Sequence, residues 1–447
     1  MDRIILEESA FMDRRTFLAV SAVSASIGAT SLDAAAPAKL PPMTAPDGID
    51  RDRASSLMEK FGFSLLVLEQ PVNVYYFTGI RSGMHRLGFE NQSFAVVAKD
   101  KSAPIRFITA QFPYYFMSAD EGLAPGVEPM LVTGPDGDEA ADAVMLATPE
   151  GESKTAREQN RRREILGAAP YYQSTEDAFK AALEGVDLSG GIVGYDTIHA
   201  HNLVAKSLPG ARKGNGLDLA KHIRLIKTER EIGLMKAASR ANIAAALETT
   251  GQFRNLGTLR NIRNHFNSQV GLLGNVPGFL VLNGAIDEAY DEDIVEGTAI
   301  LIDGVSSRAG YHGDYGRTVF IGEPASHMIR KVKTIGTAWD EVRNGLKPGM
   351  RFSDIRVQGQ AVLRKLGSSI QVPFNPHCVG LAHTEHPEFD SDGSALDLVL
   401  QPGMIISVDC PLLESGSAGT AHLEDLVLIT ESGSEAIHDT GNQIIIA

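Results

Sequence analysis

Cysteine and positive charge are both scarce in this sequence. Its 447 residues include two cysteines, Cys378 and Cys410, which allow at most one disulfide and exclude a small disulfide-stapled scaffold. We expect both to be core thiols. Lys and Arg total 41 against 56 Asp and Glu, which gives a formal net charge of −15. A surface of that sign repels nucleic-acid phosphates and anionic lipid, so neither nucleic acid nor a membrane is an expected partner.

Long apolar runs are missing as well. The strongly apolar stretch near the N-terminus, residues 17–29, is shorter than the about 20 residues that a membrane-spanning helix needs. What is present is an ordinary globular composition, with 43% hydrophobic and 22% charged residues. At roughly 150 residues per domain, the chain has room for two or three domains with substantial cores.

The first 38 residues have the features of an export leader. Arg14-Arg15 precedes Phe17-Leu18, a weakly apolar run follows, and small residues at 34–38 offer a cleavage site. This order resembles a bacterial twin-arginine signal, which implies a leader over residues 1–38 and a periplasmic location. The alternative is a frayed tail in which two arginines occur by chance.

Two folded regions are expected after the leader. Between residues 49 and 215, short apolar runs alternate with helix-compatible stretches, a pattern that predicts an α/β domain. A glycine-rich, cationic segment ends this region and predicts the domain junction, and residues 217–447 form the second region. Early in the second region, Thr228 and Glu231 predict a capping box at the start of a helix that runs to about residue 250.

In the second region, a short turn connects two apolar strands that each contain an aspartate. Asp303 lies in the apolar run 299–305, and Asp314 lies in the strand that follows. A turn centred between Arg308 and Ala309 would place the two carboxylates opposite each other, about 5 Å apart on one face of the hairpin. A buried carboxylate needs a partner, so the pair points to a site.

A second hairpin near the C-terminus repeats this arrangement. Asp409 ends an apolar strand, and a loop rich in glycine and serine places it opposite Glu424 on the returning strand. Two like-charged pairs in one domain call for cations. With His377, the set Asp303, Asp314, Asp409 and Glu424 suits manganese, cobalt, zinc or iron. Bridging carboxylates predict two divalent ions about 3.5 to 4 Å apart.

These motifs occur in the order of a known family. The chain resembles the pita-bread metallopeptidase superfamily, in the branch that holds prolidase, aminopeptidase P and creatinase. In the second region, the resemblance rests on these motifs, in chain order: Lys227-Thr-Glu-Arg-Glu231, Asp303, Asp314 with Arg317-Thr318, His377, Pro402-Gly-Met404 before Asp409, and His422-Leu-Glu424-Asp. In the first region, it rests on Asn73-x-x-Tyr76-x-Thr78-Gly79, a motif that is expected at the end of a strand.

The resemblance implies a two-domain α/β (α+β) fold. A creatinase-type N-terminal domain would occupy residues 49–215, and a pita-bread catalytic domain would occupy residues 217–447. It also implies two divalent metal ions, with manganese as the first expectation and cobalt, zinc or iron as alternatives. Pairing as a homodimer is common in this branch and is expected here.

Some positions depart from the family pattern. Asp409 stands where the family has a glutamate that also acts as general base, so its side chain is one methylene shorter. A second histidine after His377 is displaced to His383, which we expect to polarise the substrate carbonyl while Asp409 transfers a proton. His386 and His422 are the expected substrate-binding residues, and His422 stands where proline-specific members often have arginine.

The sequence favours a dinuclear metallohydrolase that cleaves short peptides near the N-terminus, of Xaa-Pro dipeptidase or aminopeptidase type. Two alternatives stay open. One is a creatinase-like hydrolase or lyase acting on a small amide or another non-peptide molecule, and the other is a metal-poor binding protein of the same fold. No Gly-x-Ser-x-Gly or His-Glu-x-x-His motif occurs, which argues against a common serine hydrolase or single-zinc protease.

Overall fold

A computed structural model describes most of the chain from residue 49 onward. The described ranges are 49–81, 93–111, 113–114, 123–133, 171–287, 289–323, 325–387, 396–413, 418–438, 440–441 and 444–447. The predicted leader, residues 1–38, lies outside them. Within these ranges, no helix combines the length and the hydrophobicity that a bilayer-spanning segment requires.

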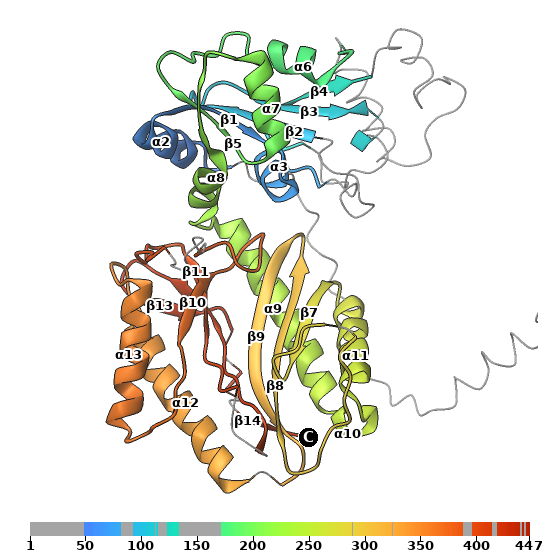
Figure 1. Ribbon diagram of the computed structural model, residues 1–447, viewed down its shortest axis with the longest axis vertical. Coiled ribbons are helices and arrows are strands. Elements are labelled where there is room, and N and C mark those ends of the chain that lie inside the picture. The colour runs from blue at the N-terminus through green and yellow to red at the C-terminus, as the bar shows by residue number, and fades with distance from the viewer. Residues whose placement is uncertain are drawn as a thin grey trace, which may run out of the picture. The chain divides into compact units, whose positions relative to one another are not determined.

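A six-stranded mixed sheet forms the first part of the fold, in the order β4-β3-β2-β1-β5-β6 (Figure 1). Its strands are β1 (Phe63–Leu68), β2 (Ser93–Ala98), β3 (Ile105–Ala110), β4 (Val127–Val132), β5 (Ile192–Tyr195) and β6 (Arg212–Asn215). The central strand β1 pairs antiparallel with β2 and parallel with β5. All six residues of β1 are buried, because helices cover both faces of the sheet.

Alternate residues of β1 face two different helix layers. Leu66 and Leu68 pack with α2, α3 and α8, whereas Leu65 and Val67 pack with α6 and α7. These helices are α2 (Arg51–Phe61), α3 (Pro71–Thr78), α6 (Thr175–Ala182), α7 (Ile198–Ser207) and α8 (Gly216–Arg224). The α/β alternation predicted for this region is therefore correct. The domain boundaries themselves stay a prediction.

One motif expected at a strand end lies in a helix instead. The segment from Asn73 to Thr78 belongs to α3, which follows β1 directly. Pro71 stands in the first turn, and Gly79 ends the helix in the left-handed conformation with a φ of 78°. Proline at the start and glycine just past the end are typical of helices, so both signals were present in the sequence.

Two four-stranded sheets form the second part, in the orders β14-β9-β8-β7 and β10-β11-β12-β13. Their strands are β7 (Val276–Leu282), β8 (Ala299–Arg308), β9 (Tyr311–Phe320), β10 (Asn375–Cys378), β11 (Ile405–Asp409), β12 (Leu426–Ile429), β13 (Ser434–Ala436) and β14 (Ile444–Ile446). The helices are α9 (Glu229–Thr250), α10 (Phe253–Leu256), α11 (Leu259–Leu272), α12 (Ser326–Gly345) and α13 (Phe352–Lys365).

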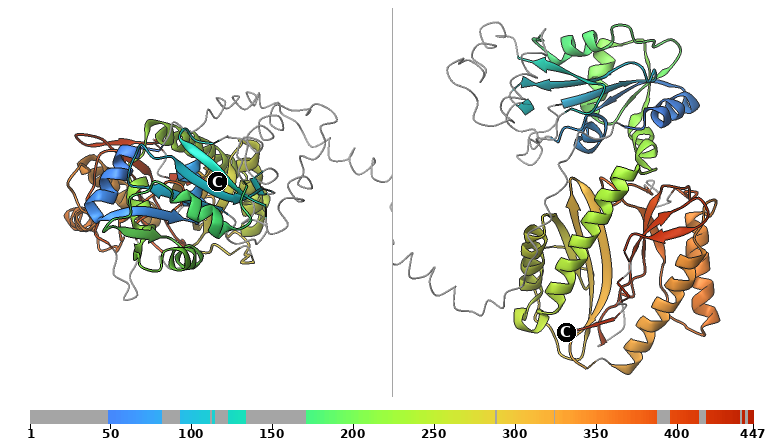
Figure 2. Two further views of the ribbon diagram at one scale, coloured as in Figure 1. Left: turned by 90° about the horizontal axis from the view of Figure 1, so that it is seen from above. Right: turned by 180° about the vertical axis from the view of Figure 1, so that it is seen from behind.

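Each of these two sheets has its own helix layer. Helices α9 and α11 pack on the first sheet, and α12 and α13 pack on the second (Figures 1 and 2). A β-bridge between Gly316 and Glu424 joins the two sheets. The two hairpins that carry the predicted acid pairs therefore lie side by side, in a mixed α/β fold of the predicted class.

Helix α9 begins with the predicted capping box. The Thr228 hydroxyl accepts a hydrogen bond from the Glu231 amide, and the Glu231 carboxylate accepts one from the Thr228 amide at 2.8 Å. The helix lies against β9 at Gly313, where a Cβ atom would come within 2.7 Å of the Ser239 backbone. Farther along the chain, the two cysteines are buried and not joined to each other, as expected for core thiols.

Candidate metal centre

The register of the β8–β9 hairpin differs from the predicted one. Asp303 pairs with Gly316, and Asp314 pairs with Val305. The turn residues are Ala309 and Gly310, with φ angles of 50° and 83°, so the turn centre lies one residue later than predicted. Two positive φ angles are the signature of a two-residue hairpin turn, and Gly310 supports it. The two aspartates are therefore diagonal rather than opposite, but they remain on the same face.

The register of the β11–β12 hairpin is the predicted one. Ser407 pairs with Leu426, and the Cys410 amide donates to the Leu423 carbonyl at 3.0 Å, which leaves Asp409 opposite Glu424. Glu424 also bridges to Gly316, the residue that pairs with Asp303. Backbone pairing thus brings the acids of both hairpins together.

His377 enters this group from β10. Its Nε2 lies 3.3 Å from Glu424 Oε1, 3.6 Å from Asp314 Oδ2 and 3.6 Å from Asp409 Oδ2. The structure therefore gathers all five residues that were predicted as metal ligands around one space. We call Asp303, Asp314, His377, Asp409 and Glu424 the carboxylate cluster.

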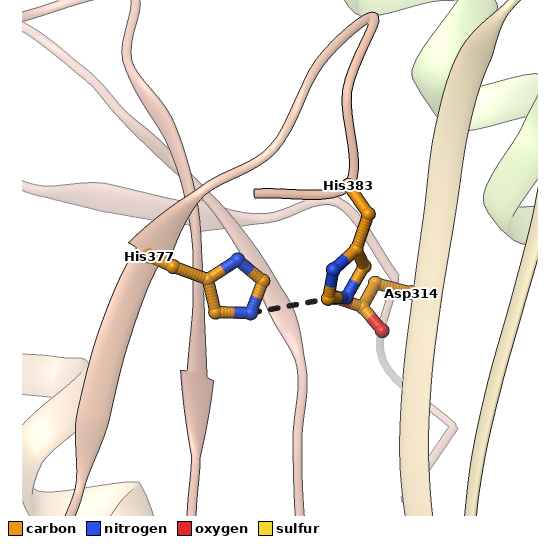
Figure 3. Close-up of side chains that lie close together, drawn as sticks. All are labelled: Asp314, His377 and His383. Carbon is orange, nitrogen blue, oxygen red and sulfur yellow. Dashed lines mark ion pairs between the residues drawn. The ribbon is translucent and has the colours of Figure 1, made fainter. Parts of the chain in front are cut away.

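His383 approaches the carboxylate cluster from the loop after β10. Its Nε2 lies 3.2 Å from Asp314 Oδ2, and its ring centroid lies 4.8 Å from that of His377 (Figure 3). The ring also packs edge-on against Phe279. The side chain of His383 is 29% exposed and that of Asp409 is 28% exposed, so solvent reaches both, and Asp303 is also partly exposed.

His386 does not join the cluster, and its role in substrate binding stays a prediction. It bridges to Cys378 in an antiparallel pair, so its side chain points to the same side as Cys378 and away from His377. Its ring packs edge-to-face against His222 at 5.1 Å instead. Because side chains alternate along β10, the residue that pairs with Cys378 points away from His377.

His422 lies inside the group rather than at its edge. It is 3% exposed, and its Nε2 lies 3.1 Å from Glu424 Oε2 and 3.7 Å from Asp409 Oδ1. With Asp303 and Glu424 it offers three ligand atoms that all lie within 4.8 Å of one another. From the sequence, His422 was expected to bind substrate, although its position two residues before Glu424 puts both side chains on one face of a strand.

Burial makes the acids of the cluster costly to ionise together. Burial and the neighbouring Glu424 carboxylate raise the pKa values of Asp303 and Asp314 well above the usual range and that of Asp409 to about 7. Both carboxylate oxygens of Asp314 and one of Asp303 lack a hydrogen-bond partner among the described residues. Hard oxygen atoms left unpaired in this way fit a divalent cation, which would allow the acids to ionise.

The neighbouring acids and burial shift the pKa values of His377, His422 and His383 in different directions. Burial opposes protonation of His377 and His422, but their contacts with Glu424 and the other acids raise both pKa values, that of His422 to about 9. Burial lowers the pKa of His383, and the acids offset this only partly. His383 is therefore a neutral imidazole at pH 7, able to donate a hydrogen bond from one ring nitrogen.

A second buried ionic group, missed by the sequence analysis, holds the loop that carries His383. Glu385 accepts from Arg224 Nε at 3.1 Å, from Lys227 Nζ at 2.9 Å and from the Leu381 amide at 3.2 Å. Burial would raise its pKa, but the two cations lower it to about 2. We call Arg224, Lys227 and Glu385 the Glu385 triad. Arg224 also donates to Asn73, which ties the motif in α3 to this loop.

Comparison with known proteins agrees with this geometry. Residues 231–431 match metallopeptidase family M24. A probable dipeptidase, PepE, from Mycobacterium tuberculosis (strain ATCC 25618 / H37Rv) is 29% identical over 158 residues, which are 35% of this chain and 41% of that protein. A Xaa-Pro dipeptidase from Lactobacillus delbrueckii subsp. lactis is 24% identical over 405 residues, which are 88% of this chain and 97% of that protein.

Among solved structures, a dipeptidase from Pyrococcus horikoshii OT3 matches with a TM-score of 0.63 at 17% identity, covering 89% of this chain and 99% of that one. This likeness shows the fold. Together with the match of residues 231–431, it supports a place for the chain in the pita-bread superfamily and a relationship to the metallopeptidases of family M24.

Proposed function

We propose that this protein is a dinuclear metal-dependent peptidase that cleaves short peptides near the N-terminus, of Xaa-Pro dipeptidase or aminopeptidase type. The observation that carries the proposal is the carboxylate cluster, in which both oxygens of Asp314 and one of Asp303 lack hydrogen-bond partners within the described ranges. The similarity to proteins described as dipeptidases and a Xaa-Pro dipeptidase supports the substrate class.

The residues of the site divide into ligands and proton-handling groups. Asp303, Asp314, His377, Asp409 and Glu424 would hold the two ions, and bound divalent ions supply the polarisation of the substrate carbonyl and the activation of water. Solvent reaches both Asp409 and His383. Asp409 would accept a proton and pass it to the leaving amine, and His383 would donate a hydrogen bond to the developing oxyanion.

The test is a metal analysis of the purified protein combined with a substrate panel. The panel contains Xaa-Pro dipeptides, longer Xaa-Pro peptides and creatine-like amides, each assayed with manganese, cobalt, zinc or iron. We expect two bound ions per chain and turnover of Xaa-Pro substrates, with manganese the first expectation. Turnover of the amides alone would indicate a creatinase-like enzyme, and a protein that binds no metal would indicate a binding protein.

We also propose that the protein is exported and forms a homodimer. The order of Arg14-Arg15 and the weakly apolar run supports export to the periplasm, and the family resemblance supports pairing. Replacing both arginines by lysine should leave the protein in the cytoplasm. Light scattering on the purified chain should give twice the 47.9 kDa of one chain.

A further inference from the structure

His422 occupies a position that mirrors that of His377. Glu424 turns Oε1 toward His377 at 3.3 Å and Oε2 toward His422 at 3.1 Å. Asp409 does the same, with Oδ2 3.6 Å from His377 and Oδ1 3.7 Å from His422. Each of these two carboxylates therefore has one oxygen beside each imidazole, which is the arrangement of a bridging ligand.

Each of the remaining two acids lies beside one of the two imidazoles. Asp314 lies on the side of His377, with Oδ2 3.6 Å from its Nε2. Asp303 lies on the other side, in the group that it forms with His422 and Glu424. The side of His377 thus has Asp314 and a second imidazole, His383, whereas the side of Asp303 has His422 alone. Each side also has one oxygen from each of the two shared carboxylates.

We propose that His422 is a metal ligand, the nitrogen donor of the second ion, and this assignment rests on the proposed dinuclear function. Two ligand atoms about 2.1 Å from one ion and at right angles to each other lie roughly 3.0 Å apart. The 3.1 Å separation of Nε2 from Glu424 Oε2 matches that spacing, and the 3.7 Å separation from Asp409 Oδ1 corresponds to a wider angle.

Among the described residues, the His422 ring has no hydrogen bond outside the cluster. Its Nδ1 is buried without a hydrogen-bond partner in the described part of the chain, so the polar contacts of the ring are those of Nε2 with the acids. The backbone is fixed by Thr318, whose hydroxyl accepts from the His422 amide at 3.0 Å. Gly316 leaves space for the ring, because a Cβ there would lie 2.1 Å from His422 Cδ2.

A second imidazole changes the metals that the site prefers. Carboxylate oxygens suit manganese, whereas imidazole nitrogen suits zinc and iron. If His422 supplies this second nitrogen, both positions should favour zinc or iron, in place of the manganese expected from the four acids and His377 alone. Loss of His422 should then weaken zinc binding more than manganese binding.

X-ray absorption spectroscopy of the zinc-loaded full chain tests the assignment directly. The parent is expected to show at least two imidazoles per two zinc ions, and His422→Gln should lose one of them. By calorimetry, the second zinc ion should bind at least tenfold more weakly to the variant, with a smaller loss for manganese. The matched control is His265→Gln, because His265 lies on α11 and forms a hydrogen bond with Thr249. This variant should change neither measurement.

Fewer than two imidazoles in the zinc-loaded parent would overturn the assignment without any variant. An unchanged spectrum and unchanged affinities in His422→Gln would also overturn it. If His422→Gln loses one imidazole but the parent cleaves no peptide, the assignment stands and the proposed peptidase function fails. If the spectrum of the variant is unchanged while the parent cleaves Xaa-Pro peptides, only the assignment fails.

Discussion

The carboxylate cluster and the Glu385 triad both contain fully buried acids, but they differ in what compensates the charge of those acids. Glu385 and Asp314 have side chains that are 1% and 0% exposed. Glu385 has hydrogen bonds to two cations and a backbone amide, and its pKa is lowered to about 2. Both oxygens of Asp314 lack a hydrogen-bond partner among the described residues, and burial raises its pKa.

Burial alone therefore does not separate a structural acid from a functional one. The protein supplies its own counter-ions to Glu385, so the triad can hold the loop of His383 without any bound ligand. In the carboxylate cluster the acids outnumber the cationic groups, and charge balance requires something from outside the chain. Each prediction below tests this difference, and they are ordered from the largest expected effect to the smallest.

The largest effect is expected for Asp409→Asn. Asparagine keeps the shape of the side chain but loses the charge and the ability to accept a proton, so turnover of an Xaa-Pro dipeptide should fall about 10²- to 10⁴-fold. The measurement is kcat at saturating metal, with the bound metal quantified. Asp187→Asn, an exposed aspartate in the first part of the fold, is the control. Turnover within about threefold of the parent with two ions bound would remove Asp409 from the mechanism.

Much of this site could be predicted from the sequence. Asp303, Asp314, Asp409 and Glu424 were found because an acid inside an apolar strand is unusual and hairpin pairing is regular. The prediction for the β8–β9 turn was wrong by one residue because sequence alone gave little weight to Gly310 and its positive φ angle. Since the side chains still share a face, the error changed the pairing but not the cluster.

Other features of the site depend on contacts between residues that lie far apart in the sequence, and these contacts could not be predicted. The Glu385 triad joins residues 158 and 161 positions apart, and neither a periodic pattern nor a motif connects them. The separation of His386 from the cluster is another such feature, because the loop after β10 folds back and pairs His386 with Cys378, on the far side from His377. His422 was assigned to the substrate from the family pattern, although the predicted pairing of Asp409 with Glu424 already put its side chain on the face of Glu424, and the structure places it 3.7 Å from Asp409 Oδ1.

The triad itself can be tested by Glu385→Gln. Arg224 and Lys227 would stay buried without an acid, so the free energy of unfolding should fall by about 3 to 5 kcal/mol in urea denaturation. Glu435→Gln is the matched control, because its ion pair with Lys236 has a similar length of 3.0 Å but is exposed. That variant should lose less than about 1 kcal/mol.

The effect of Glu385→Gln should also depend on pH. The pKa of Glu385 is about 2 in the folded protein and roughly 4.3 in the unfolded chain. Its stabilising contribution is therefore present above about pH 4.3 and is lost as the pH falls toward 2. The difference between parent and variant should narrow over that range, and a constant difference would contradict the assigned charge state.

Metal binding should change the free energy of unfolding by less than the loss expected for Glu385→Gln. At a free metal concentration about 100 times the Kd, one bound ion adds about 2.7 kcal/mol to the free energy of unfolding, if it binds only the folded state. Thermal denaturation with and without chelator measures this difference as a shift in Tm. The shift should persist in Glu435→Gln and disappear when Asp303 and Asp314 are both replaced by asparagine. Equal Tm values for chelated and metal-loaded parent would contradict the metal centre.

The smallest effect is expected for Asp314→Asn, and its sign is the informative part. In chelated protein the change removes a like charge from a crowded group, so stability should rise by about 1 kcal/mol. In metal-loaded protein it removes a ligand, so stability should fall instead.

Asp196→Asn is the control, because this buried acid accepts hydrogen bonds from the Glu69 and Gln70 amides and from Asn73 Nδ2. Losing those acceptors should destabilise the protein by about 1 to 3 kcal/mol with or without metal. If Asp314→Asn behaved like Asp196→Asn under both conditions, Asp314 would be a structural acid, and its lack of hydrogen-bond partners would not indicate a cation site.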